Sequence, residues 1–308
     1  MLANFLTVGQ QVVILYLLIA VGFVCGKTKF FSEDAIGGLT DFVLYVVTPC
    51  VMIKAFQRPF EAALAGAFFQ VAAFAAAVTV FAYVLARLTL HDTDKRRERV
   101  YRFSVLFSNC AFMGLPLEEA LLGSRGVFFG AASLAVFQLL TWSMGLAVMR
   151  GERGGLSLKK LFLNPGILGV AAGLLLFFTS FSLPEVVNAP VNALAALNTP
   201  IPMVIIGYHL SRAKLAPVLR DGRTWLAAAE RLIVVPLAAL ALGLLCGMDG
   251  TALLAAMVAL CPPTAAICTM FAARCQQDTA LSVSLVSLST LLSIFTMPLL
   301  IVLTQSLL

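Results

Sequence analysis

Long apolar runs separated by short polar segments occupy almost the whole chain of 308 residues. Hydrophobic residues make up 61% and charged residues 12%, and the mean hydropathy of +0.99 is more than a water-soluble domain can bury. Because a membrane-spanning helix needs about 20 apolar residues, the pattern predicts an all-α integral membrane protein with ten transmembrane helices. The expected spans are 8–26, 34–56, 62–89, 100–122, 126–149, 164–182, 186–210, 224–246, 251–273 and 279–305.

Basic residues predict the orientation of these spans. Of the 21 Lys and Arg residues, seventeen lie in or beside the loops after the odd-numbered spans, and three lie beside the opposite loops. Cytoplasmic loops carry such an excess, so we expect a multi-pass protein with both termini on the outer side. The first apolar run has Lys27 and Lys29 after it and no basic residue before it, the reverse of a cleavable signal peptide.

The two halves of the chain echo each other at an offset of 151 residues. Thr48 corresponds to Thr199, Cys110 to Cys261, and Gln138 to Ser289. Five spans in each half place the halves in opposite orientations. The pattern therefore predicts a 5+5 inverted-topology repeat, with halves 1–150 and 164–308 joined by a cytoplasmic linker, 151–163. In such proteins substrate sites lie at the midplane, where paired helices are interrupted. Coincidence is the alternative for so few matches.

Interrupted helices are predicted where Gly and Pro fall in the middle of a span. Span four contains the stretch from Asn109 to Pro116, and span nine contains Pro262-Pro263. Proline removes a backbone donor and restricts the residue before it, and the freed backbone groups need partners inside the protein. A simple proline kink is the alternative. If both helices break and cross, the N–H groups at their inner ends form a binding site for a carboxylate.

Several uncharged residues are candidates for this anion site. Asn109 has an amide that can donate to an anion, and Gln138 lies in the middle of span five. An interhelical hydrogen bond is the alternative role for each. The complete set of substrate-binding candidates is Asn109, Cys110, Gly114, Pro116, Gln138, Pro262, Pro263, Thr264, Ser289, Thr48 and Thr199.

Acidic residues within the spans are few, and a charged acid there is costly. Asp41, Glu118 and Glu119 are candidates for carrying a coupling proton, and an interfacial or ion-paired acid is the alternative for each. We expect Glu230 and Arg231 to form a local charge pair near the cytoplasmic surface.

Other chemistry finds little support in the sequence. The seven cysteines contain no C-x-x-C pair and are interpreted as buried apolar residues, so neither a metal nor a cofactor is expected. No P-loop, G-x-S-x-G or H-E-x-x-H motif occurs, which disfavours an ATPase or an intramembrane enzyme. The basic excess of +6 is a topology signal, so nucleic acid is not an expected partner.

The motifs resemble the auxin efflux carrier family, which includes plant auxin exporters and bacterial permeases linked to malonate and malate. The resemblance is carried by F-V-L-Y-V-V-T-P up to Pro49, N-x-x-x-M-G-x-P from Asn109 to Pro116, Q-x-x-x-W at Gln138 and Trp142, and Asn164-Pro165. Plant exporters have Pro where this chain has Ser108. They also have a long cytoplasmic loop between the two halves, whereas in this chain the corresponding loop is short. A small organic acid therefore fits better than auxin.

The resemblance implies a fold like that of the bile-acid sodium symporters. Spans one, two, six and seven would form a scaffold, often dimeric, and spans three to five and eight to ten a mobile transport unit. The expected function is elevator-like secondary transport of a small carboxylate in the bacterial inner membrane, with a proton or sodium ion as a possible partner. An anion channel, a non-transporting sensor and, less favoured, an intramembrane enzyme are the alternatives.

Overall fold

The computed structural model describes residues 2–57, 59–151, 165–213 and 215–308, and these residues are almost entirely helical. Six helices in the described part are long and apolar enough to cross a membrane. They are Glu33–Phe56, Ala62–Thr89, Cys110–Arg150, Glu185–Arg212, Gly222–Leu245 and Thr279–Leu307. Val12–Lys27, Ile167–Thr179 and Gly250–Leu260 are shorter apolar helices. The protein is therefore an integral membrane protein, as its composition predicts.

The first half of the chain runs from α1 to α7. Its helices are α1 (Leu2–Lys27), α2 (Glu33–Phe42), α3 (Thr48–Phe56), α4 (Ala62–Thr89), α5 (Lys95–Leu106), α6 (Leu115–Leu140) and α7 (Leu146–Arg150). Three π-helical turns, η1 (Val43–Val47), η2 (Cys110–Gly114) and η3 (Thr141–Gly145), join some of them. Within α6, Gly123 has a φ of 61°, which other residues rarely adopt, so α6 consists of two helices that meet at this glycine. This turn lies between the expected end of span four, residue 122, and the expected start of span five, residue 126.

The second half runs from α9 to α17. Its elements are α9 (Pro165–Thr179), α10 (Glu185–Ala195), η4 (Ala196–Asn198), α11 (Pro200–Arg212), α12 (Leu215–Leu219), α13 (Gly222–Ala229), η5 (Glu230–Val234), α14 (Val235–Leu245), α15 (Gly250–Leu260), α16 (Ile267–Arg274) and α17 (Thr279–Leu307). The expected linker, 151–163, lies outside the described residues except for Gly151.

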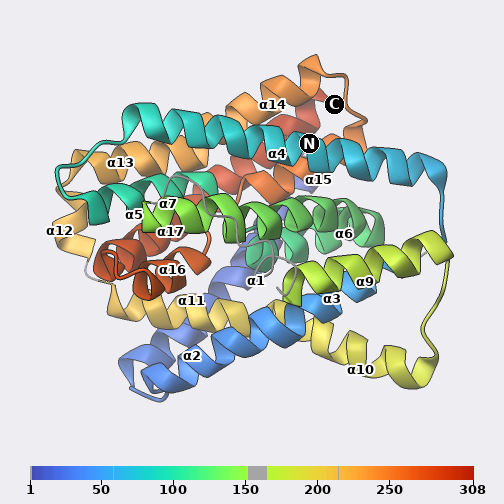
Figure 1. Cartoon of the computed structure of the whole chain (residues 1–308), viewed down its shortest axis with the longest axis horizontal. Helices are drawn as coiled ribbons and strands as arrows, with labels where there is room; N and C mark the ends of the chain where they lie inside the picture. Colours follow the sequence, from blue (N-terminus) through green and yellow to red (C-terminus); the bar gives the residue numbers. More distant parts are fainter. Residues whose placement is uncertain (1, 58, 152–164, 214) are drawn as a thin grey trace.

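Glycines allow two pairs of helices from opposite halves to pack closely. Gly22 on α1 and Gly207 on α11 lie against each other's backbone, and Gly169 and Gly173 on α9 lie against Pro49 and Phe56 on α3. Figure 1 shows α9 alongside α3. Without a hydrophobic driving force between helices in lipid, such close approach maximises van der Waals contact. Each half thus packs its first helix against the other half.

An ion-pair network joins the beginnings of α5 and α13. Asp221 pairs with Arg97 at 2.5 Å, and Asp92 pairs with Arg223 at 3.1 Å. Burial alone would raise the pKa of Asp221, but hydrogen bonds from the Arg223 N–H and the Tyr101 hydroxyl, with the nearby arginines, hold it below its ordinary value. The network fixes these two helix ends relative to each other.

Candidate functional site

Two helices are interrupted inside the protein, one at the predicted pair Pro262-Pro263 and one at residues 107–109, where the predicted stretch from Asn109 to Pro116 begins. After α5 ends at Leu106, three residues pass before η2 begins at Cys110. After α15 ends at Leu260, six residues, including Pro262 and Pro263, pass before α16 begins at Ile267. Neither proline can donate a backbone hydrogen bond, so the helix cannot continue through this pair.

The two interruptions contact each other, and we call residues 107–109 and 261–266 together the crossing. A short antiparallel bridge pairs Ser108 with Thr264. The Asn109 N–H donates to Pro263 O at 2.8 Å, and the Ala265 N–H donates to Phe107 O at 2.9 Å. Two of the backbone N–H groups at the breaks are therefore satisfied by the other break, as an enclosed apolar environment requires.

Side chains of the crossing strengthen this pairing. The Ser108 hydroxyl donates to Ala259 O at 2.7 Å, and the Thr264 hydroxyl donates to Ser104 O at 3.0 Å. The Thr264 N–H donates in turn to the Ser289 hydroxyl on α17 at 3.2 Å. Thr264 and Ser289 thus hold α15–α16 against α5 and α17.

Arg231 binds the two helix ends that carry unpaired carbonyls. Its Nη1 donates to Val105 O on α5 at 3.0 Å, and its Nη2 donates to Leu260 O on α15. The residue is only 1% exposed. A cation at the C-terminal end of a helix is favourable because the unpaired carbonyls make that end partly negative. The expected surface pair of Glu230 and Arg231 is therefore wrong for Arg231, which points into the protein from the π-helical turn η5.

The opposite ends of the interrupted helices begin at the crossing. The first N–H groups of η2 have no acceptor within their own helix, as at every helix N-terminus. At the start of α16, the N–H groups of Cys268 and Thr269 donate to Ala265 O at 3.0 Å and to Ala266 O at 3.2 Å. The Asn109 side chain, 3% exposed, precedes η2, and its Nδ2 has no hydrogen-bond partner in the described part of the chain. Asn198 on η4 donates to Ala111 O at 2.9 Å and so connects α10–α11 to the same region. The local charge at this end is partly positive.

The remaining uncharged candidates lie at varied distances from the crossing. Gly114 packs against the backbone of α15, and Pro116 lies in the first turn of α6. Thr48 is buried, and its hydroxyl donates to Val43 O at 2.9 Å. Thr199, next to Asn198, occupies the N-cap position of α11, and its side chain makes no capping hydrogen bond. Gln138 is buried on α6 and is not among the residues that line the cavity described next.

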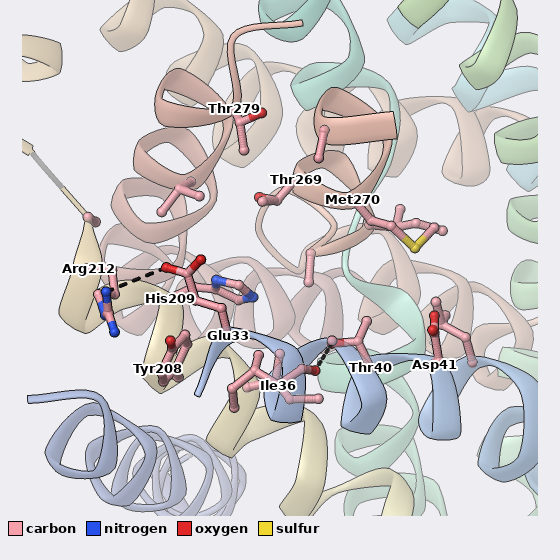
Figure 2. Close-up of a pocket in the computed structure, with 18 of the residues that line it drawn as sticks. Glu33, Ile36, Thr40, Asp41, Tyr208, His209, Arg212, Thr269, Met270 and Thr279 are labelled. Carbon is pink, nitrogen blue, oxygen red and sulfur yellow. Dashed lines mark hydrogen bonds and ion pairs between the residues drawn. The ribbon is translucent and has the colours of Figure 1, made fainter. Parts of the chain in front are cut away.

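A cavity of about 520 Å³ leads to the crossing from the side where α2 and α17 begin and α11 ends. Phe112 on η2 and Ala266 and Ile267 at the start of α16 line it, so the first turns of both interrupted helices reach the same space. Figure 2 shows Thr40 and Asp41 on α2 lining the cavity with Thr269 and Met270 on α16.

Charged groups of this cavity gather near the start of α2. Glu33 pairs with Arg212 at 3.5 Å, and His209 lies beside them, as Figure 2 shows. Asp41 also lines the cavity and is exposed. Apolar side chains make up most of the remaining wall, so the cavity suits a ligand with few charged groups.

Three acidic candidates have different environments. Asp41 is open to the cavity, and the exposed Glu119 pairs with Lys54 on α3 at 3.1 Å. Glu118 is fully buried, and neither carboxyl oxygen has a hydrogen-bond partner in the residues described. Among those residues no group of three or more His, Cys, Asp or Glu could hold a metal ion, and the cysteines are free thiols.

Apolar helices, two joined interruptions and a cavity that reaches them are features of a membrane transport protein. A family model described as membrane transport protein matches residues 7–159 and 152–301, which together cover nearly the whole chain. The chain therefore belongs to this family, the auxin efflux carrier family of membrane transporters. No curated protein matches the chain.

Sequence reasoning missed two residues that bind the helix ends beside the crossing. Arg231 is a single arginine inside an apolar span, which could have marked it as a buried functional cation. Asn198 directly precedes the Thr199-Pro200 pair, but only the folded chain brings it within reach of Ala111.

Proposed function

We propose that this protein is a secondary active transporter of small organic anions, with carboxylates as substrates. The observation that carries the proposal is the meeting of two helix N-termini, those of η2 and α16, beside the Asn109 amide nitrogen, which has no partner among the described residues. Anions are stabilised at helix N-termini by the N–H groups and by the partial positive charge there. Binding at this place needs little side-chain charge.

The substrate reaches the crossing through the cavity. Glu33, Arg212 and Thr279, which line it, are helix-end residues next to loops that the basic residues assign to the cytoplasm, so this conformation opens inward. On the opposite side Lys54 and Glu119 connect α3 to α6. Alternating access requires such a state, in which one route is open and the other is closed.

Movement of the site would be elevator-like. In the proposed ten-span, 5+5 inverted repeat, the scaffold contains α1, α2–α3, α9 and α10–α11, and the transport unit contains the other spans. The packing of α1 on α11 and of α9 on α3 supports this division, because each pair lies within the proposed scaffold and joins the two halves. A homodimer formed through the scaffold in a bacterial inner membrane, with both termini outside, completes the proposal.

Counterflow in proteoliposomes tests the proposal. Vesicles loaded with one unlabelled acid are given the same acid in labelled form, using acetate, lactate, malonate and malate in turn. We expect transient saturable accumulation of at least one acid, and Asn109→Ala should lower its rate at least tenfold. Asn188→Ala is the matched control, because Asn188 bonds to Gln57 away from the crossing. Wild-type counterflow in Asn109→Ala would remove this residue from the site.

The same assay separates the alternatives. A channel would give flux without saturable counterflow, and a sensor would give neither. An intramembrane enzyme would release chemically altered label. Any of these results for the whole panel would contradict the proposed function.

A further inference from the structure

The carboxyl group of Glu118 is enclosed by the protein without a polar partner. Its exposed fraction is 0%, and neither oxygen accepts a hydrogen bond in the part of the chain described. The turn at Gly123 folds the second segment of α6 back, so that Gly130 faces this carboxyl. A Cβ atom at position 130 would lie 2.6 Å from Oε1 and closer still to Oε2. Glycine at this position therefore leaves the space that the carboxyl occupies.

Within the described ranges of the chain, no neighbouring cation compensates a charge on Glu118. On α3, Lys54 pairs with Glu119 instead, and Cys50 carries no charge. On η2, the thiol of Cys110 is the titratable group within electrostatic range of Glu118. Arg125, on α6 beyond the Gly123 turn, is exposed.

The other elements that pack on α6 offer no counter-ion either. α9 and α15 contain no titratable residue in their described ranges. The charged groups of α4 and α1, Arg87 and Lys27, lie in the last turns of these helices. Arg231 is engaged with the carbonyls of Val105 and Leu260. An isolated carboxylate in such surroundings is far more costly than the neutral acid, so Glu118 holds a proton in this conformation.

Proton binding to Glu118 and anion binding at the crossing must favour each other. Glu118 follows Asn109 by nine residues, or about 13 Å at a helical rise of about 1.5 Å per residue. At an effective dielectric constant of about 20, two negative charges at this separation weaken each other's binding about tenfold. Because linkage is reciprocal, a proton on Glu118 strengthens anion binding by the same factor.

Building on the proposed function, we infer that Glu118 is the proton-binding site of the transporter and that one proton crosses the membrane with each anion. The bond that forms is an O–H bond on the Glu118 carboxylate, with the proton taken from water on one side and returned to water on the other. The neighbouring Glu119 and Ala120 are exposed, so the helix that carries Glu118 reaches the protein surface within one residue of it. Asp41 and Glu119 do not fit this role, because both are exposed and Glu119 is paired with Lys54.

Infrared spectroscopy of the purified protein tests the proton directly, without any substrate. At neutral pH we expect a protonated carboxylic acid band that is absent in Glu118→Gln and present in Glu119→Gln and Asp41→Asn. Glu118→Gln replaces a neutral acid by a neutral amide of the same shape, so folding should survive. The same band in Glu118→Gln as in the wild type would overturn the inference.

Proteoliposomes test the coupling. In the wild type, an acidic exterior should drive accumulation of labelled malonate or acetate, and the apparent Kd of the anion should fall about tenfold as Glu118 becomes protonated. Glu118→Gln should lose both responses to pH, whereas Glu119→Gln, at an exposed residue that does not line the cavity, should keep them. Wild-type counterflow without any response to a pH gradient would refute proton coupling and leave the proposed transport function standing. Absence of counterflow for every acid would instead contradict the transport function, and the infrared result would still decide the protonation of Glu118.

Discussion

Replacing Gly22 by alanine should destabilise the protein through the contact of α1 with α11. A Cβ atom on Gly22 would lie 2.7 Å from Val204 Cα and nearer to Val204 O, whereas ordinary contact begins at 3.4 Å. The obstacle is backbone, which cannot rotate away, so the two helices must separate by at least the difference, 0.7 Å.

The cost follows from the size of this separation. A gap of about 0.5–1 Å removes about a quarter to a half of the dispersion energy between facing atoms. Overpacking of this kind costs about 1–3 kcal/mol. Alanine also favours a helix over glycine by about 1 kcal/mol, which opposes the loss. Gly9→Ala is the matched control for that gain, because a Cβ atom on Gly9 of the same helix meets nothing within 4 Å.

Thermal unfolding in detergent, followed by tryptophan fluorescence, measures the difference between the two variants. We expect Gly22→Ala to melt about 3–10 °C below Gly9→Ala. Gly207→Ala should behave like Gly22→Ala, and the double variant should lose less than the sum because both changes act on one contact. Equal melting temperatures for Gly22→Ala and Gly9→Ala would refute the reasoning.

Three further predictions concern charged groups. Arg231→Lys keeps the charge but lacks the forked guanidinium that reaches both Val105 O and Leu260 O. The free energy of unfolding, measured by denaturant titration, should therefore fall by about 1–3 kcal/mol. Unchanged stability would show that one contact suffices. Lys54→Ala should change stability by less than about 1 kcal/mol, because its pair with Glu119 is exposed, and a larger loss in the same titration would contradict this. Burial raises the pKa of Asp221, but the hydrogen bonds and nearby arginines lower it by more. The ionised Asp221 therefore stabilises the folded protein fully above its ordinary pKa of 3.8. This stabilisation is lost as the pH falls through the lower pKa of the folded state. Asp221→Asn should therefore show less loss of melting temperature than the wild type on acidification through this range, and identical acid profiles would contradict the assignment.

Local chemistry made the interruption after α15 predictable, whereas the one after α5 lies before the Gly114 and Pro116 that suggested it. Pro262-Pro263 removes two adjacent backbone donors, and this holds in any fold, so the end of α15 could be located from sequence. Gly123 lies between the expected spans four and five, at the left-handed turn that divides α6. Apolar length predicted membrane helices, because hydrocarbon thickness sets a minimum for them.

Tertiary contacts were not predictable in the same way. Arg231 follows Glu230 in the sequence, which suggests a local pair, but the π-helical turn η5 directs the arginine toward α5 and α15. Gln138 and Asn109 are both polar residues within apolar stretches of the sequence, yet only Asn109 lies at the crossing. The sequence does not give the angle at which α6 packs, so it could not distinguish the two. The cavity depends on the spacing between α2, α11 and α16, which no single segment determines.

The position of Arg231 has a mechanical consequence. One guanidinium, carried between α13 and α14, is bonded to the final turns of two other helices that are distant in sequence. Moving η5, the end of α5 or the end of α15 away from the other two would stretch a hydrogen bond of the buried guanidinium. We therefore expect η5 and the ends of α5 and α15 to move together in any conformational change, so that the edge of the crossing beside them keeps its shape.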